Sequence, residues 1–229
     1  SRGLGDVYKR QMPNHISTNF RVTGPTAEVK RFIKDAVGKD SVLSLDSLLP
    51  MPSELLMVSS PVKIMTQQEI DKQWADWKAN KEAGKTNSFD SDKPFGLGIT
   101  KENSNSYRAK YGTDNWYDWA IANWGSKWGV YDETEWNITD VEEDGLSSAG
   151  IFYQTAWSPV TKAWEHISKN YPSLEFFHEF ADEGGAFVGN QLIQDGNIID
   201  DNDYEWNSDE GIAIREGVGM WVEEEEEEV

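Results

Sequence analysis

The clearest hydrophobic pattern in the chain is an alternation over residues 15–22. The residues that share one face of this segment are Ile16, Thr18, Phe20 and Val22, and polar residues lie between them. A period of two is typical of a strand with one buried face. Over residues 26–37 the apolar positions are instead three and four residues apart, as in an amphipathic helix. The sequence therefore predicts a strand followed by a helix.

The same two periods recur after residue 130 and predict four more strands and a second helix. The strands are expected near 131–141, 149–155, 174–180 and 187–193, and the helix near 159–169. Asp144-Gly145 is a strong signal for a two-residue hairpin turn. Ser158-Pro159 is typical of a helix start, with serine as N-cap and proline at the first helical position. The resulting order, β-α-(insertion)-β-β-α-β-β, contains the split βαβ arrangement of an α+β, ferredoxin-like fold.

The rest of the chain is expected to surround this core. Residues 1–11 resemble a translated adaptor and are treated as a non-native extension, so the domain is expected to span 12–199. An insertion of helix and loop is expected at about 57–112. Residues 200–229 end in six glutamates and are expected to form a solvated, frayed acidic extension.

The inserted and connecting segments have weaker patterns. Residues 66–83 predict a polar helix, and residues 84–106, rich in Gly, Asn, Ser and Lys, predict a mobile surface loop. Residues 45–52 are interpreted as an extended connector. Residues 113–122 predict a short aromatic helix.

The charge of the chain limits the kinds of partner it can bind. The net charge is −20, and residues 132–229 hold 26 Asp and Glu against 3 Lys and Arg. Such an acidic half repels nucleic-acid phosphates, so we expect no direct nucleic-acid binding. It would attract a protein with a basic surface, although acidic surfaces also simply favour solubility. There are no cysteines. No apolar run is long enough for a membrane helix, so we expect a cytoplasmic protein without membrane contact.

Two tryptophan-centred segments carry the candidate chemistry. They are Asn123-Trp124-Gly125-Ser126-Lys127-Trp128 and Thr155-Ala156-Trp157-Ser158-Pro159. The predicted hairpin connects them, so we expect them to converge at one edge of the sheet. A planar base or sugar could stack on Trp124, Trp128 or Trp157, while Lys127 and the helix end near Ser158 hold a phosphate. The alternative is that the rings pack in the core, Lys127 points to water and Ser158 is an ordinary cap. Under that alternative Trp157 is a core residue whose truncation destabilises the fold.

With the opening Met12-Pro13-Asn14 and the Pro50-Met51-Pro52 segment, these two tryptophan segments resemble the YubB-type ferredoxin-like domain family of phages and plasmids. The resemblance implies a ferredoxin-like fold and a phage or mobile-element setting in the cytoplasm of a host bacterium. It makes a role in counter-defence plausible by analogy. It implies no activity.

Two functional hypotheses follow. The first is a non-enzymatic binding protein that captures a small nucleotide-like ligand with Trp124, Lys127, Trp128, Trp157 and Ser158. The alternative is an acidic protein inhibitor that occupies a basic groove of a host protein. The sequence contains no phosphate-binding glycine loop, nucleophile elbow or metal-ligand spacing, so we expect no enzymatic activity, cofactor or metal. A nucleotide-cleaving enzyme would need a general base at the same pocket. Homo-oligomer formation is left open.

Overall fold

The computed structural model describes residues 14–84, 94, 96–140 and 145–220. The chain divides into two compact units. One joins Ser1–Leu49 to Trp124–Val229, and the other is Pro50–Asn123. The expected insertion at 57–112 falls within the second unit. The expected extension at 1–11 lies outside the described residues.

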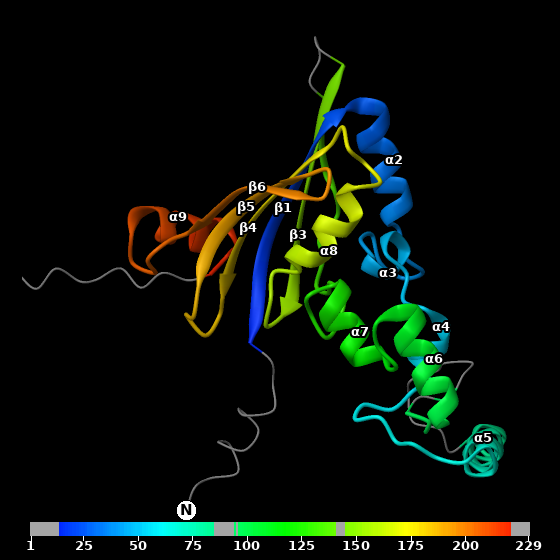
Figure 1. The fold of residues 1–229 in the computed structure, drawn as a ribbon. Coiled ribbons are helices and arrows are strands. Elements are labelled where there is room, and N and C mark those ends of the chain that lie inside the picture. Colours follow the sequence, from blue (N-terminus) through cyan, green and yellow to red (C-terminus); the bar gives the residue numbers. More distant parts are fainter. Residues whose placement is uncertain (1–13, 85–93, 95, 141–144, 221–229) are drawn as a thin grey trace, which may run out of the picture. The chain divides into compact units, whose positions relative to one another are not determined.

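The first unit is built on one six-stranded sheet (Figure 1). The strands are β1 (His15–Pro25), β2 (Asn137–Asp140), β3 (Leu146–Ala156), β4 (Glu175–Asp182), β5 (Val188–Gln194) and β6 (Asn197–Asp203). Their order across the sheet is β2-β3-β1-β4-β5-β6, and all neighbours are antiparallel.

The first four strands and two helices form the ferredoxin-like core. Helix α2 (Thr26–Ala36) follows β1, and α8 (Thr161–Ser168) connects β3 to β4. In this arrangement β1 and β3 are the two central strands of the β2-β3-β1-β4 set, as the split βαβ pattern requires. The α+β, ferredoxin-like prediction is confirmed.

Aromatic packing joins the two helices to one face of the sheet. Phe20 of β1 stacks on Trp164 of α8 with ring centroids 4.3 Å apart, and it also contacts Phe32 of α2 and Phe176 of β4. The Trp164 indole N–H donates a hydrogen bond to the Tyr153 hydroxyl, 3.0 Å away, inside this core. The predicted alternation of residues 15–22 therefore corresponds to a buried face covered by α2 and α8.

The opposite face is partly covered by α9 (Asp209–Gly217). Ile214 and Val218 of this helical segment pack against Ala181 and Val188 of β4 and β5. The prediction of a solvated tail from residue 200 is therefore wrong for β6 and α9. Ser208 accepts a hydrogen bond from the Gly211 N–H and so caps α9, and Tyr204 and Trp206 pack on the same apolar cluster as Ile214 and Val218.

Other boundaries differ from those predicted. The strand expected over 131–141 is shortened to Asn137–Asp140, preceded by an isolated pairing of Tyr131 with Gln154. Asp140 pairs with Ser147, so β2 and β3 form the expected hairpin, but residues 141–144 lie outside the described part. The connector expected to be extended over 45–52 contains α3 (Leu45–Leu48), and α4 (Ser53–Leu56) follows it.

The Pro50–Asn123 unit contains α4, α5 (Gln67–Glu82), α6 (Lys101–Tyr111) and α7 (Trp116–Asn123). Thr66 and Glu69 form a reciprocal capping box at the start of α5. The loop expected over 84–106 is wrong for its last part, because α6 begins at Lys101. The Thr100 side chain caps α6, and Gly112 ends it in the left-handed conformation.

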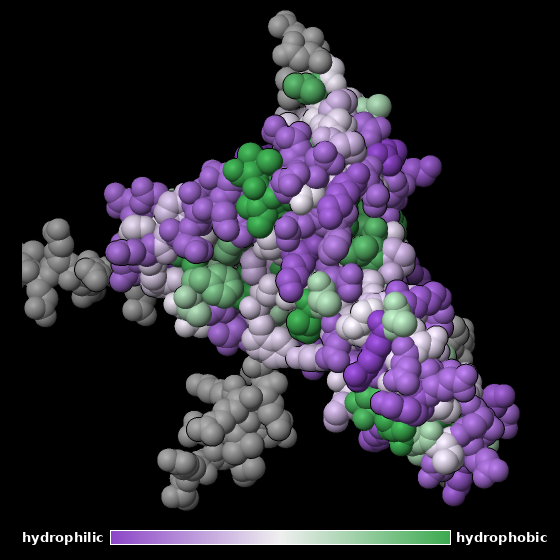
Figure 2. All heavy atoms as spheres, in the orientation of Figure 1, coloured by the Kyte–Doolittle hydropathy of each residue, from purple (hydrophilic) through white to green (hydrophobic). Residues whose placement is uncertain are grey.

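A buried carboxylate stabilises the turn between α6 and α7. Asp114 accepts hydrogen bonds from the Ser104 hydroxyl at 2.6 Å and from Arg108 Nε at 3.0 Å. Burial opposes ionisation of Asp114, but these donors outweigh it and lower its pKa. Within the described residues, no helix has the length and apolar character needed to cross a membrane. In the view of Figure 2, hydrophilic residues cover most of the coloured surface and hydrophobic residues form separate small patches.

Candidate functional site

Two loops meet where β1 begins and β3 ends. The first is residues 124–130 and the second is residues 157–160, after β3. The Trp157 N–H donates to the Asn14 carbonyl at 3.0 Å, and the Ser126 hydroxyl donates to the Ala156 carbonyl at 2.8 Å. The two tryptophan segments therefore lie side by side.

Their contact creates a cluster of Lys127, Trp128 and Trp157, called here the Trp–Lys cluster. Lys127 Nζ lies 4.4 Å from the Trp128 ring centroid and 5.8 Å from that of Trp157. The two indole rings are 5.9 Å apart with an interplanar angle of 21°. Trp128 is 41% exposed and Trp157 is 47% exposed. The cluster thus holds one ammonium group beside two nearly parallel, partly exposed indole rings.

The backbone that holds Trp157 is strained. Trp157 has φ 62° and Val160 has φ 56°, so two non-glycine residues within four positions adopt the left-handed conformation. Each such residue costs about 1–2 kcal/mol. The Thr155 hydroxyl donates to the Ser158 carbonyl at 2.6 Å and helps to hold this turn. Strain of this kind accumulates where surrounding contacts enforce a particular side-chain position, often at functional sites.

The structure changes the position assigned to two of the five predicted residues, Trp124 and Ser158. Trp124 is buried and its indole N–H donates to the Leu49 carbonyl at 3.0 Å, so its ring belongs to the core and not to an exposed stacking surface. Ser158 does not cap a helix, because α8 begins at Thr161 after the left-handed Val160. The predicted phosphate site at a Ser158-capped helix end is therefore wrong. Trp157, interpreted in the structural alternative as a core ring, is exposed.

Polar groups beside the cluster fix the start of β1. His15 Nδ1 and the Tyr131 hydroxyl oxygen are 2.8 Å apart, within hydrogen-bond distance. Burial, with the nearby charges of Asp132 and Glu183, raises the pKa of Tyr131 to about 12. The phenol is protonated at neutral pH, and the imidazole tautomer of His15 sets which of the two groups donates.

Asn14 was missed as a structural residue of this site. Its side chain donates to Asp182 Oδ2 at 3.2 Å, and its carbonyl accepts from Trp157. The Met12-Pro13-Asn14 segment pointed to Asn14 as a residue of interest. The hydrophobic pattern around it could not identify Asp182 as its partner, because the two residues are almost 170 positions apart. Among the residues that the structure describes, no group of three His, Cys, Asp or Glu side chains is placed to hold a metal ion.

The fold and this exposed cluster define a ferredoxin-like α+β protein with an aromatic and cationic surface at one end of its sheet. Residues 133–229 match the family model described as the ferredoxin-like domain in Api92-like protein. A solved structure, protein api92 from Yersinia pseudotuberculosis, is similar with 8% sequence identity and a TM-score of 0.46, over 84% of this chain and 98% of that chain. No curated protein matches the chain. The YubB-type name and the phage or plasmid setting stay predictions.

Proposed function

We propose that the chain is a non-enzymatic binding protein that captures a small nucleotide-like ligand on the Trp–Lys cluster. The observation that supports this most directly is the position of the Lys127 ammonium, 4.4 and 5.8 Å from two half-exposed indole rings. In a soluble protein, exposed large aromatic rings that gather around a cation are typical of a binding surface.

The chemistry suits a ligand with a planar ring and an anionic group. Stacking of a base on an aromatic side chain contributes about 1–3 kcal/mol, and any base offers a suitable face. The ammonium of Lys127 can then meet the phosphate. Residues 132–229 are strongly acidic and repel a phosphate. The positive charge of Lys127 is therefore needed to hold the phosphate at this cluster. A phage or mobile-element protein of this kind could sequester a signalling nucleotide, as the counter-defence hypothesis requires.

The proposal is tested by calorimetry against a panel of linear and cyclic nucleotides. Lys127→Gln is expected to weaken binding of a captured nucleotide about 10- to 100-fold, the effect of losing a hydrogen bond to a charged group. Trp128→Ala should also weaken it by removing one stacking face. Lys34→Gln on α2 is the matched control, since it removes an exposed charge elsewhere and should leave affinity unchanged. Unaltered nucleotide affinity in Lys127→Gln would contradict the proposal.

A second candidate function is inhibition of a basic host protein, and strand β6 favours it. β6 is an edge strand, six of its seven residues are exposed, and it carries Asp200, Asp201 and Asp203. Asp201 accepts a hydrogen bond from Gln191, whereas Asp203 makes no side-chain hydrogen bond or ion pair within the described residues. Under this hypothesis, affinity for a basic host protein falls in Asp200→Asn/Asp203→Asn and survives Lys127→Gln. The opposite result favours nucleotide capture.

A further inference from the structure

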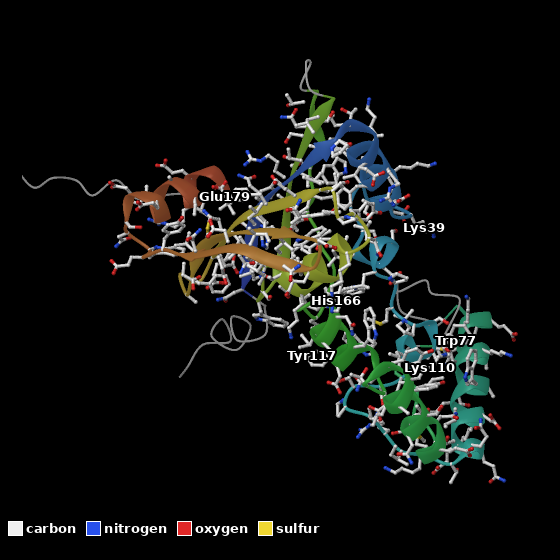
Figure 3. The ribbon with its side chains drawn as sticks, turned by 45° about the horizontal axis from the view of Figure 1, so that its top comes forward. Lys39, Trp77, Lys110, Tyr117, His166 and Glu179 are labelled. Carbon is white, nitrogen blue, oxygen red and sulfur yellow. The ribbon has the colours of Figure 1, made fainter. Side chains whose placement is uncertain are left out.

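A hollow separate from the Trp–Lys cluster lies on the face of the sheet opposite α2 and α8. It has a volume of about 390 Å³ and is formed by β1, β3, β4 and the segment that precedes β2. This volume is within the range of small-molecule sites. The side chains and backbone that matter here are Arg21, Glu135, Gly150, Phe152, Phe177 and Glu179. Figure 3 labels Glu179, on the face of the sheet that α9 also contacts.

Arg21 is the cation of this hollow. In the sheet register it lies between Gly150 of β3 and Phe177 of β4. Its guanidinium carbon is 5.1 Å from the Phe177 ring centroid. Among the described residues, Arg21 makes no ion pair or hydrogen bond through its side chain. A guanidinium held over an aromatic ring without a carboxylate partner keeps its planar set of donors available for an anionic group.

Gly150 leaves the floor of the hollow open. Its backbone is not in the left-handed region, and a Cβ atom placed there would meet only the Phe20 carbonyl oxygen at an ordinary 3.7 Å. The strand therefore has no conformational need for glycine at this position. Glycine within a strand weakens the sheet and often marks a place where another molecule approaches the backbone.

The charges of the hollow select the class of ligand. Glu135 and Glu179 line it together with Arg21, and within the described residues neither carboxylate has a hydrogen-bond or ion-pair partner. A phosphate dianion would meet two carboxylates and an acidic protein, whereas a molecule with one carboxylate and one ammonium group complements both signs of charge. Phe152 and Phe177 add apolar wall.

We propose that this hollow binds a free amino acid with an apolar or aromatic side chain. Arg21 receives the carboxylate, Glu179 and Glu135 receive the ammonium group, and the side chain lies against Phe152 and Phe177 over Gly150. This site is separate from the Trp–Lys cluster, so the proposal does not depend on nucleotide capture.

Calorimetry of the full chain with L-phenylalanine as the probe tests this. The two matched ligands are 3-phenylpropionate, which lacks the ammonium group, and 2-phenylethylamine, which lacks the carboxylate. Each should bind about 10-fold more weakly than L-phenylalanine or worse, since each loses one charge-assisted contact. Arg21→Gln should weaken L-phenylalanine binding by a similar factor. Lys127→Gln should leave it unchanged.

Gly150→Val provides a steric test. Valine suits a strand and its Cβ has room, so the variant should keep the circular dichroism spectrum and melting temperature of the natural sequence while it blocks L-phenylalanine. If the variant does not fold, the Arg21→Gln measurement alone decides. Absence of L-phenylalanine binding at millimolar concentration, equal affinity for 3-phenylpropionate, or undiminished affinity in Arg21→Gln would overturn the proposal. Stronger binding of adenosine monophosphate or a short single-stranded RNA through Arg21 would also overturn it.

Discussion

Because the backbone at Trp157 is left-handed, we predict an unusual order of stability for the glycine and alanine variants at this position. Glycine normally destabilises regular structure relative to alanine because the unfolded chain gains conformational freedom. At φ 62°, however, alanine retains the steric cost of the left-handed region and glycine does not. Trp157→Gly should therefore be more stable than Trp157→Ala.

The magnitudes follow from exposure. Trp157 is 47% exposed, so about half of a side chain of roughly 200–250 Å² is buried, which corresponds to about 2–3 kcal/mol lost in Trp157→Ala. Relief of the backbone strain returns about 1–2 kcal/mol in Trp157→Gly, and the greater freedom of glycine in the unfolded chain takes back about 0.5–1 kcal/mol. The net loss for glycine is then about 2 kcal/mol, still smaller than the loss for alanine.

Trp164→Ala is the reference for truncation of a fully buried tryptophan, because the Trp164 indole is not exposed to solvent. Trp164→Ala should cost about 3–5 kcal/mol for the truncated ring, plus about 1–3 kcal/mol because the buried Tyr153 hydroxyl loses its partner. Urea denaturation followed by far-UV circular dichroism measures all three variants against the natural sequence. If Trp157→Ala is at least as stable as Trp157→Gly, the left-handed conformation and the strain argument are both wrong.

Two further predictions concern titration and the Pro50–Asn123 unit. Burial lowers the pKa of His178 to about 4, below its value of about 6.5 in an unfolded chain. The stability that the neutral imidazole contributes is therefore present above pH 6.5 and is lost as the pH falls toward 4, by up to about 3 kcal/mol. Urea denaturation at a series of pH values measures this loss, and the loss should be absent in His178→Gln. Asp114→Ala should destabilise the Pro50–Asn123 unit by about 2–3 kcal/mol, because Ser104 and Arg108 lose a buried carboxylate. Hydrogen exchange should then accelerate in α6 (Lys101–Tyr111), and unchanged protection there would contradict the role assigned to Asp114.

Local periodicity was sufficient to predict the ferredoxin-like core. β1, α2 and β3 each have a continuous apolar face, and that face is set by neighbours within a few residues. α9 was missed because the residues that dock it, Ile214 and Val218, lie in a segment dominated by acidic residues, and their partners are far away in the sequence. α6 was missed because it has one buried residue, Ser104, and its stability comes from caps and from Asp114.

In the candidate site, too, features set by nearby residues could be predicted, whereas features set by distant residues could not. Convergence of the two tryptophan segments was predictable from the hairpin that connects them. The burial of Trp124 was not, because its hydrogen-bond partner is the Leu49 carbonyl, 75 residues away. The hollow around Arg21 depends on the register of three strands, which brings Gly150 and Phe177 to either side of one arginine.

The two proposed sites share a physical feature that follows from the acidity of the chain. Arg31 and Arg108 are paired with carboxylates, and Arg31 also lies over the Tyr171 ring. Lys127 and Arg21 also lie over aromatic rings but, within the described residues, have no carboxylate partner. An aromatic face attracts a cation without neutralising its charge, so the charge stays available to an anion from solution. In a protein with net charge −20, an exposed cation of this kind can attract an anionic group against the general repulsion, and each proposed site centres on one.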